Sequence, residues 1–324
     1  MRTCLRRLRN NPLLLALHLS FLLIFAGAVF TCLFRQKGIV RLSPGEPVVE
    51  FRSADGRILP LPSVMELDSF RVEYHPGGIS PRDYVSSLKV GEDTCVISMN
   101  NILKRDGFRF CQAGYDYDGS SFLSVNRDPM GIAIVYSGFA LYAVSGLCVL
   151  LFCGKRGIRR VLVLALAGVM GIVVYRMEYG SQGIMLQPVL DSPWLPVHVS
   201  LAMASYFLFG LTFLFAVVAF VRPSSAMELR TLSLSLLHSA EWLLGVGIIT
   251  GSVWANDSWG SYWSWDPKET LALLTYLVYA LPLHPDIRFL RKPRTFHIYM
   301  FLAILAVAAT YFGVNLLPSL HSYG

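Results

Sequence analysis

Long apolar runs restrict the fold of this chain more than any other feature of its sequence. Seven runs approach or exceed the length that a helix needs to cross a bilayer, about 20 residues; they occupy residues 12–34, 130–153, 160–176, 197–221, 241–255, 270–283 and 296–317. Hydrophobic residues make up 54% of the chain and charged residues 15%, which excludes an ordinary soluble domain. We therefore expect an all-α polytopic membrane protein with about seven transmembrane helices and one β-rich extracytoplasmic domain between the first two.

The first apolar run follows a basic stretch, as the core of a secretory signal peptide would. However, it continues into Cys32-Leu-Phe-Arg35 without an A-x-A-like cleavage site. We interpret residues 12–34 as a retained helix, with a cleaved signal peptide as the alternative.

Basic residues in the short connections predict the orientation, because cytoplasmic loops carry an excess of Lys and Arg. The basic connections lie at the N-terminus and near 154–160, 222–230 and 285–295. The alternate connections, near 177–196 and 256–268, contain only Lys268. The N-terminus is therefore predicted to be cytoplasmic, and the C-terminus extracytoplasmic. The net charge of +7 reflects this bias and does not indicate nucleic-acid binding.

Residues 35–128 are the one stretch of globular composition. Alternating runs typical of strands occur at 48–52, 70–74, 94–98, 108–110 and 122–125. Turn signals accompany them at Ser43-Pro-Gly45, Asp55-Gly56, Pro76-Gly-Gly78 and Asp118-Gly119. We predict a small antiparallel sheet, which at about ninety residues can bury a modest core of its own.

Four of the six tryptophans fall within twelve positions between two apolar runs, at Trp254, Trp259, Trp263 and Trp265. One or two would suffice as an interfacial anchor. Four, interleaved with glycine, serine and aspartate, indicate a broad aromatic surface for a flat, apolar, π-rich ligand, and a tetrapyrrole fits better than a peptide or a sugar. Residues 254–269, the tryptophan segment, are predicted to form an extracytoplasmic loop.

Four of the seven histidines form two pairs at matched depth in the predicted topology. His198 and His321 lie at the membrane face of the tryptophan segment, whereas His18 and His284 lie in the inner half of the membrane. Neutral imidazole is a usual axial ligand of haem iron, and a histidine in hydrocarbon is functional by default. We predict an outer and an inner bis-histidine haem site. The alternatives are interfacial snorkelling for the outer pair and an interhelical hydrogen bond for the inner pair.

The remaining histidines, His75, His238 and His297, have no partner at matched depth, and we expect them to be structural. Cys95 and Cys111 are the only cysteines in the predicted extracytoplasmic domain, and they either form a disulfide or are unpaired strand residues. The chain has no C-x-x-C, which argues against a thioredoxin-like role and against covalent attachment of haem to the chain itself.

The motifs resemble a known family. Trp259-Gly-Ser-Tyr-Trp263-Ser-Trp265-Asp266-Pro-Lys-Glu-Thr270 resembles the WWD signature of haem-handling proteins in cytochrome c maturation. Ile249-Thr-Gly-Ser-Val-Trp-Ala255, Gly313-Val-Asn315 and Leu320-His-Ser-Tyr-Gly324 are similar to the CcsA (ResC) branch, from about residue 160 onward. Residues 1–153 resemble the C-terminal part of CcsB (ResB), through Leu17-His-Leu19, Gly38-Ile-Val-Arg-Leu-Ser-Pro-Gly-Glu46 and Val125-Asn-Arg-Asp-Pro129. Together with residues 154–324, the cytochrome c assembly part, they resemble a fused CcsBA cytochrome c synthase of the system II pathway.

This resemblance implies a haem-delivery protein and holocytochrome c synthase (haem lyase) of the bacterial inner membrane, which handles haem b as transported ligand and substrate. It places iron ligands at His198 with His321 and at His18 with His284. Trp254, Trp259, Trp263 and Trp265 are expected to contact the haem, and Asp266 to position them or the haem, unless it is a solvated loop carboxylate. No catalytic acid, base or nucleophile is assigned, because thioether formation needs proximity and orientation more than a strong side-chain base.

The implied partners are an apocytochrome c with a C-x-x-C-H motif, thiol-reducing factors and membrane lipid. CcsB proteins begin with further membrane helices, which implies either a separate polypeptide that supplies them or a version that works without them. Two other functions stay open. One is a haem exporter or binding protein without lyase activity, and the other is a solute channel or receptor-like bundle that binds no haem.

Overall fold

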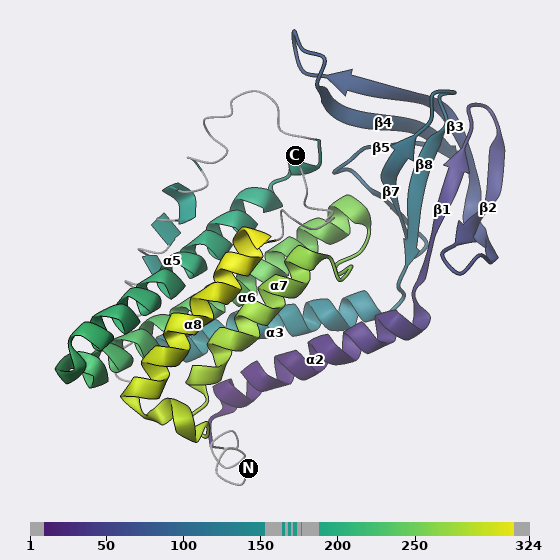
Figure 1. Cartoon of the computed structure of the whole chain (residues 1–324). Helices are drawn as coiled ribbons and strands as arrows, with labels where there is room; N and C mark the ends of the chain where they lie inside the picture. The colour runs from purple at the N-terminus through teal and green to yellow at the C-terminus, as the bar shows by residue number, and fades with distance from the viewer. Residues whose placement is uncertain are drawn as a thin grey trace.

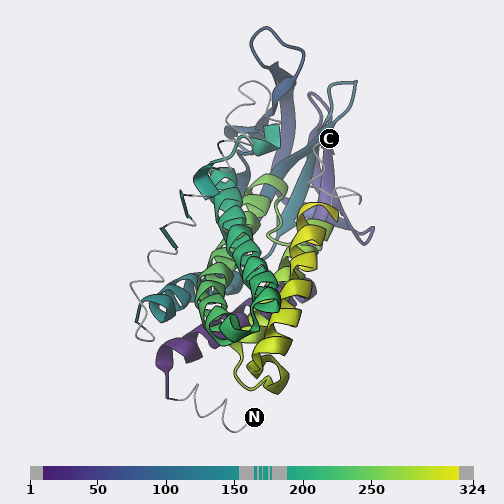
Figure 2. The same cartoon turned by 60° about the vertical axis from the view of Figure 1, so that its left-hand side comes forward.

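The computed structural model describes residues 10–152, 164–165, 168–169, 171–173, 176 and 188–313. In these residues an antiparallel sheet lies at one end of a group of long helices (Figures 1 and 2). The predicted run at 160–176 falls mostly outside the described residues. So does most of the connection at 177–196.

The sheet directly follows α2 (Pro12–Phe34), the first helix of the described residues. Its eight strands are β1 (Gln36–Leu42), β2 (Pro47–Ser53), β3 (Ile58–Tyr74), β4 (Pro81–Val90), β5 (Asp93–Ile97), β6 (Leu103–Arg105), β7 (Phe108–Tyr115) and β8 (Ser121–Arg127). They pair in the order β5-β4-β3-β2-β1-β8-β7-β6. The five predicted strand segments all fall on these strands, and the four predicted turns contain Gly45, Gly56, Gly77 and Gly119 at positive φ, where glycine carries no steric cost.

The core of the β domain comes from alternate residues of nearly all its strands. Fully buried members include Leu42, Met65, Leu88, Phe110 and Leu123. The two ends of the sheet approach each other, because Arg105 on β6 donates to the Val90 carbonyl at 3.0 Å and to Asp93 beside it at 2.9 Å. The sheet therefore curls around one core, as twisted antiparallel sheets do.

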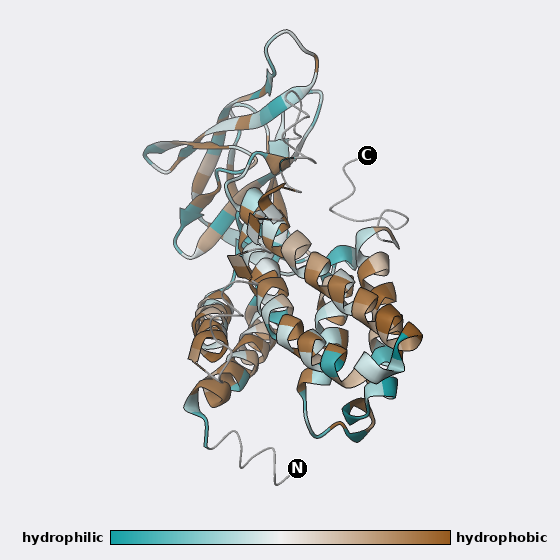
Figure 3. Ribbon diagram, turned by 90° about the vertical axis from the view of Figure 1, so that its left-hand side faces the viewer, coloured by the Kyte–Doolittle hydropathy of each residue, from teal (hydrophilic) through white to brown (hydrophobic). Residues whose placement is uncertain are grey.

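Six helices of the described residues form the membrane part: α2, α3 (Gly131–Phe152), α5 (Trp194–Val221), α6 (Ala226–Trp259), α7 (Pro267–Ala280) and α8 (Pro293–Tyr311). All of them except α7 are long and apolar enough to cross a membrane, and hydrophobic residues predominate along the helices (Figure 3). With 14 residues, α7 is about 21 Å long at 1.5 Å per residue, short of a bilayer core.

The predicted spans at 12–34, 130–153 and 197–221 agree closely with α2, α3 and α5. The predicted span at 296–317 overlaps α8, and residues 314–317 lie outside the described residues. The prediction that a span begins at residue 241 is wrong, because α6 already begins at Ala226. Polar residues such as Ser233, His238 and Glu241 lower the hydropathy of its first half. They do not interrupt the helix, because its backbone groups remain hydrogen-bonded within the helix whatever the side chains are.

Close helix packing joins α2 and α3 to each other and to the other helices of the membrane part. A β-carbon at Gly27 of α2 would collide with Val135 of α3, so glycine permits this approach. Trp242 of α6 donates to the Ala143 carbonyl of α3 at 3.1 Å. Between α5, α6, α7 and α8, Phe209 stacks on Tyr279 with ring centroids 3.7 Å apart in an apolar cluster. The helices thus form one packed assembly beneath the sheet.

Candidate functional site

The tryptophan segment is partly helical. Helix α6 continues to Trp259 and ends at Gly260, whose φ of 72° is a left-handed C-cap. Asp266 is the N-cap of α7, and its carboxylate and that of Glu269 form a capping box. The structure therefore places Trp254 and Trp259 on a helix and only Trp263 and Trp265 in the turn of residues 260–266. The prediction of a loop over 254–269 was too long.

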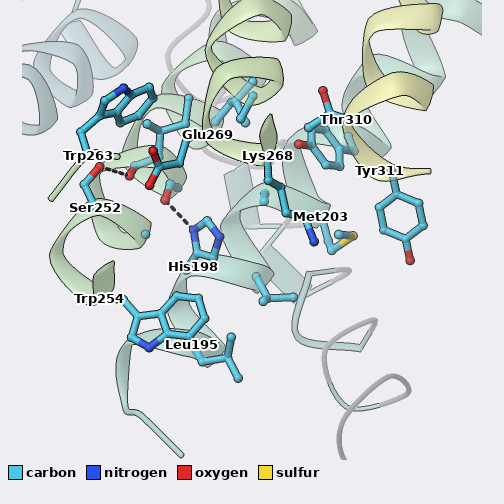
Figure 4. Close-up of a pocket in the computed structure, with 18 of the residues that line it drawn as sticks. Leu195, His198, Met203, Ser252, Trp254, Trp263, Lys268, Glu269, Thr310 and Tyr311 are labelled. Carbon is cyan, nitrogen blue, oxygen red and sulfur yellow. Dashed lines mark hydrogen bonds between the residues drawn. The ribbon is translucent and has the colours of Figure 1, made fainter. Parts of the chain in front are cut away.

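A cavity of about 440 Å³ lies beside the tryptophan segment (Figure 4). That volume is within the range of about 300–1,000 Å³ common for pockets that enclose small organic ligands. Residues from α5, α6, α7 and the end of α8 line it; the polar and aromatic ones include His198, Trp254, Trp263, Lys268, Glu269 and Tyr311. Leu195, Val199 and Leu244 are among its apolar lining residues. A mostly apolar cavity with few polar groups is typical of a ligand site.

His198 of α5 is held by α6. Its Nδ1 donates to the Gly247 carbonyl at 2.7 Å, which is the dashed line at the imidazole in Figure 4. A β-carbon at Gly251 would lie 2.7 Å from both Nδ1 and Cε1 of His198, so this contact requires glycine. With its proton on Nδ1, the imidazole carries its lone pair on Nε2, the usual arrangement of a metal-ligating histidine whose other nitrogen is hydrogen-bonded to a carbonyl.

The four tryptophans form two pairs and not one flat surface. Trp254 and Trp259 have ring centroids 5.5 Å apart, and Trp263 and Trp265 meet edge-on at 5.8 Å and 90°. Only Trp254 and Trp263 line the cavity. Trp254 is buried, with its ring 6.2 Å from that of His198 and its indole N–H donated to the Val189 carbonyl. Trp265 is 71% exposed.

His18 of α2 and His284, just after α7, are brought together by the fold. Their ring centroids lie 6.4 Å apart with the planes at 85°. Each Nδ1 donates to a carbonyl four residues earlier, that of Leu14 at 2.8 Å and that of Ala280 at 3.0 Å. A metal ion bound between two imidazoles separates their ring centroids by roughly 6 Å. This distance is the sum of two metal–nitrogen bonds of about 2 Å, the value for zinc, and the distance from each nitrogen to its ring centroid. The separation is thus compatible with one iron between the rings.

His321 lies outside the described residues. Two of the three histidines expected to be structural make contacts of that kind: His238 Nδ1 donates to the Leu234 carbonyl, and the buried His297 donates through Nε2 to the Ala226 carbonyl at 2.9 Å. His75 lies at the β3–β4 turn, and its buried Nε2 has no hydrogen-bond partner among the residues that the structure describes. Within the described parts of the chain, no group of three or more His, Cys, Asp and Glu side chains is placed to hold a metal ion.

The β domain and the adjoining end of α2 fix the tryptophan segment through several contacts. Asn126 of β8 donates to the Gly260 carbonyl, and Arg35 donates to Ser261 at 3.0 Å. Tyr262 donates to Thr31, the last buried residue of α2, at 2.8 Å. Lys104 and Asp257 form an ion pair at 3.5 Å. The sheet therefore positions the turn that carries Trp263.

Burial at this junction changes the ionisation of three groups. It raises the pKa of the Cys111 thiol to about 12, and a β-carbon at Gly260 would lie 2.9 Å from this sulfur. Burial, with a smaller contribution from the charge of Arg35, lowers the pKa of Lys37. Burial raises the pKa of Glu269, although its carboxylate accepts N–H bonds from Ser264 and Asp266. Cys95 and Cys111 are both free thiols, so the predicted alternative of a disulfide between them does not hold.

Most lining residues were not identified from the sequence, and among the polar and aromatic ones these include Lys268, Glu269 and Tyr311. The pattern Asp266-Pro-Lys-Glu269 could have identified two of them. An N-cap residue with Glu three positions later marks the start of a helix, so Lys268 and Glu269 are expected in a first helical turn that directly follows the tryptophans. Asp266 is buried and caps α7, and it is not one of the residues that line the cavity.

Comparisons with known proteins identify the family of the chain. The sequence model of the family described as cytochrome C assembly protein matches residues 132–321, and that of the ResB-like family matches residues 10–125. The cytochrome c biogenesis protein CcsA of a Synechococcus species is 39% identical, over 43% of this chain and 57% of its own length. CcsA of Mesostigma viride is 38% identical over the same shares. Protein NrfI of Wolinella succinogenes is 40% identical over 43% of this chain and 17% of its own length. The chain thus spans somewhat more than half the length of the CcsA proteins it matches.

Proposed function

Since the chain belongs to the cytochrome c assembly protein family and carries a ResB-like segment before that part, as CcsBA-type fused proteins do, we propose that it delivers haem to the outer face of the membrane and promotes its thioether attachment to apocytochromes. The observation that carries the proposal is the cavity that His198, oriented by its bond to the Gly247 carbonyl, lines together with Trp254 and Trp263. Haem is the substrate here, not a resident cofactor.

The outer site uses His198 and His321 as iron ligands. Trp254 and Trp263 form aromatic walls at this cavity, and apolar residues such as Leu195 and Val199 exclude water from the porphyrin face. The chain supplies position and orientation, which account for a large part of the rate of such a step. The C-x-x-C-H thiols of the apocytochrome add to the haem vinyl groups, and its histidine replaces one of the two ligands of this chain.

The inner site uses His18 and His284 and lies earlier on the path of the haem. Its geometry favours this role, because both Nδ1 atoms are engaged with carbonyls and the ring separation leaves room for one iron. The exposure of His284 gives a ligand access to the pair from the bundle surface.

The inner pair lies toward the cytoplasm. The end of the bundle away from the sheet carries the exposed residues Arg222, Arg288, Arg291 and Arg294 (Figure 1). By the positive-inside rule this end is cytoplasmic, and the sheet and the tryptophan segment are extracytoplasmic. The membrane is the cytoplasmic membrane of a bacterium.

The test has two stages. Protein purified from a haem-replete host should show a bis-histidine absorption spectrum, which His198→Ala alters at the outer site and added imidazole partly restores. A purified protein that shows no Soret band in any preparation would refute haem handling. Co-expression with an apocytochrome, in a host without other maturation factors, then separates a synthase, which yields covalent haem, from an exporter, which does not.

His18→Ala and His284→Ala test the inner site. Each should lower the haem content at both levels, because the inner pair lies upstream. An inner-site variant that fills its outer site normally would show that the pair is structural.

A further inference from the structure

A glutamate is buried in the middle of α6 with no bond to its carboxyl group. Glu241 is 4% exposed, and neither carboxyl oxygen has a hydrogen-bond partner. Its neighbours on α6, including Leu237 and Leu244, belong to the apolar cluster between the helices. An ionised carboxylate in such a place is very unfavourable unless it is paired. The arrangement therefore holds Glu241 as a neutral carboxylic acid.

Tyrosine hydroxyls from three other helices surround this acid. Tyr142 of α3 donates to the backbone carbonyl of Glu241 at 3.1 Å and lies 3.1 Å from the hydroxyl of Tyr276 on α7. Tyr279 on α7 is fully buried, and its hydroxyl has no partner. Tyr299 of α8 is also within electrostatic reach of the Glu241 carboxyl, as are the other three tyrosines.

No charged side chain of the described residues compensates the acid. The titratable groups that face it are tyrosines from α3, α7 and α8, and α5 contributes Tyr206 to the same apolar cluster. From α2, Phe21 packs on the rings of Tyr142 and Tyr276. Each hydroxyl can both donate and accept, so water that enters the bundle can bond to these hydroxyls and take up the proton of the acid.

The cluster lies between the two histidine levels. Glu241 precedes Gly247, which holds His198, by six positions, about 9 Å along the helix. On the other side, Phe21 lies close to one turn from His18 and contacts Tyr142 with ring centroids 5.5 Å apart. A ligand that moved from one level to the other would pass this depth of the bundle.

We propose that Glu241 and the surrounding tyrosine hydroxyls form an intramembrane proton-binding site. The acid keeps its proton in the closed bundle and releases it to water when the bundle opens. The consequence for haem rests on the proposed function: the negatively charged propionates pass a neutral acid, whereas a carboxylate at this depth would repel them.

Infrared spectroscopy of the haem-free protein tests the site without reference to haem. At pH 7, where an exposed glutamate is ionised, the wild type should show the C=O stretching band of a protonated carboxylic acid. Glu241→Gln should lack this band. Glu228→Gln, at an exposed position on the first turn of the same helix, should keep it. Identical acid bands in the wild type and Glu241→Gln would overturn the proposal.

Two further measurements keep the test decisive. If Glu241→Gln does not fold, titration of the wild type serves instead: the band should persist at pH 7 and shift in Glu241→Asp, and its absence would refute the site. When the pH is raised until the band disappears, haem loading of the outer site should fall at least tenfold in the wild type but not in Glu241→Gln. Equal losses in both proteins would refute the link to haem, while the infrared result decides the proton site separately.

Discussion

Replacing Gly251 by alanine should displace His198, while the histidine itself stays unsubstituted. The new β-carbon would lie 2.7 Å from Nδ1 and Cε1 of His198, whereas carbon atoms in contact are separated by about 3.5–4.0 Å. The imidazole must therefore move by roughly 1 Å, and the 2.7 Å bond from Nδ1 to the Gly247 carbonyl cannot survive that movement.

The magnitude follows from the loss of this orienting bond. Removing a hydrogen bond that holds a metal-ligating histidine typically lowers metal affinity by about 10–100-fold, which corresponds to about 1.4–2.8 kcal/mol. The helix itself should not suffer, because alanine is more favourable than glycine in a helix interior by about 1 kcal/mol. The expected result is thus weaker binding in a protein that folds normally.

The assay is a titration of haem into haem-free protein in detergent, followed by absorption, with thermal unfolding measured in parallel. Gly210→Ala is the matched control, because Gly210 also lies in a helix and has nothing within 4 Å of a β-carbon. The control should bind haem as the wild type does. Equal affinity and equal spectra for Gly251→Ala and the wild type would refute the assignment of His198 as a ligand held by α6.

Three further predictions concern the tryptophan segment and its support. Trp263→Ala should weaken haem binding by at least about 1 kcal/mol, the value of an aromatic pair contact, and Phe should restore most of it. Trp265→Ala should have a much smaller effect, because Trp265 is 71% exposed and does not line the cavity; equal losses in the two titrations would contradict this assignment. Asn126→Ala leaves the buried Gly260 carbonyl without its donor and should lower the free energy of unfolding by about 1–3 kcal/mol. Proteolysis within the turn of residues 260–266 should also become faster. Unchanged stability would mean that the sheet does not hold the turn. The raised pKa of Cys111, about 12 against 9.0 for a free thiol, stabilises the fold fully below pH 9, and this contribution is lost as the pH rises from 9 to 12. Unfolding measured across that range should show a smaller loss of stability in Cys111→Ala than in the wild type, and identical slopes would argue against a buried neutral thiol.

Several features were predictable because they depend on local sequence. The apolar runs of α2, α3, α5 and α8 mark helices, since the apolarity of successive residues sums independently of the rest of the chain. The turns with Gly56 and Gly119 predicted the hairpins, because the backbone conformation there favours glycine. The start of α6 could not be predicted in this way, because Ser233 and Glu241 are polar and buried only by their neighbours.

The sequence pointed to some of the residues that line the cavity, His198, Trp254 and Trp263, but not to their geometry. The sequence alone determined that the chain is a membrane protein of the cytochrome c assembly family. It also predicted histidines and tryptophans grouped by depth, because depth follows from position along a helix. Only the tertiary structure decided that Trp254 and Trp263 face the cavity while Trp265 does not, that Asn126 of the sheet holds Gly260, and that His18 meets His284. The physical reason is that the direction of a side chain and the partner it meets depend on how helices cross and where the chain reverses. These are properties of packing among distant segments, and no single segment contains them.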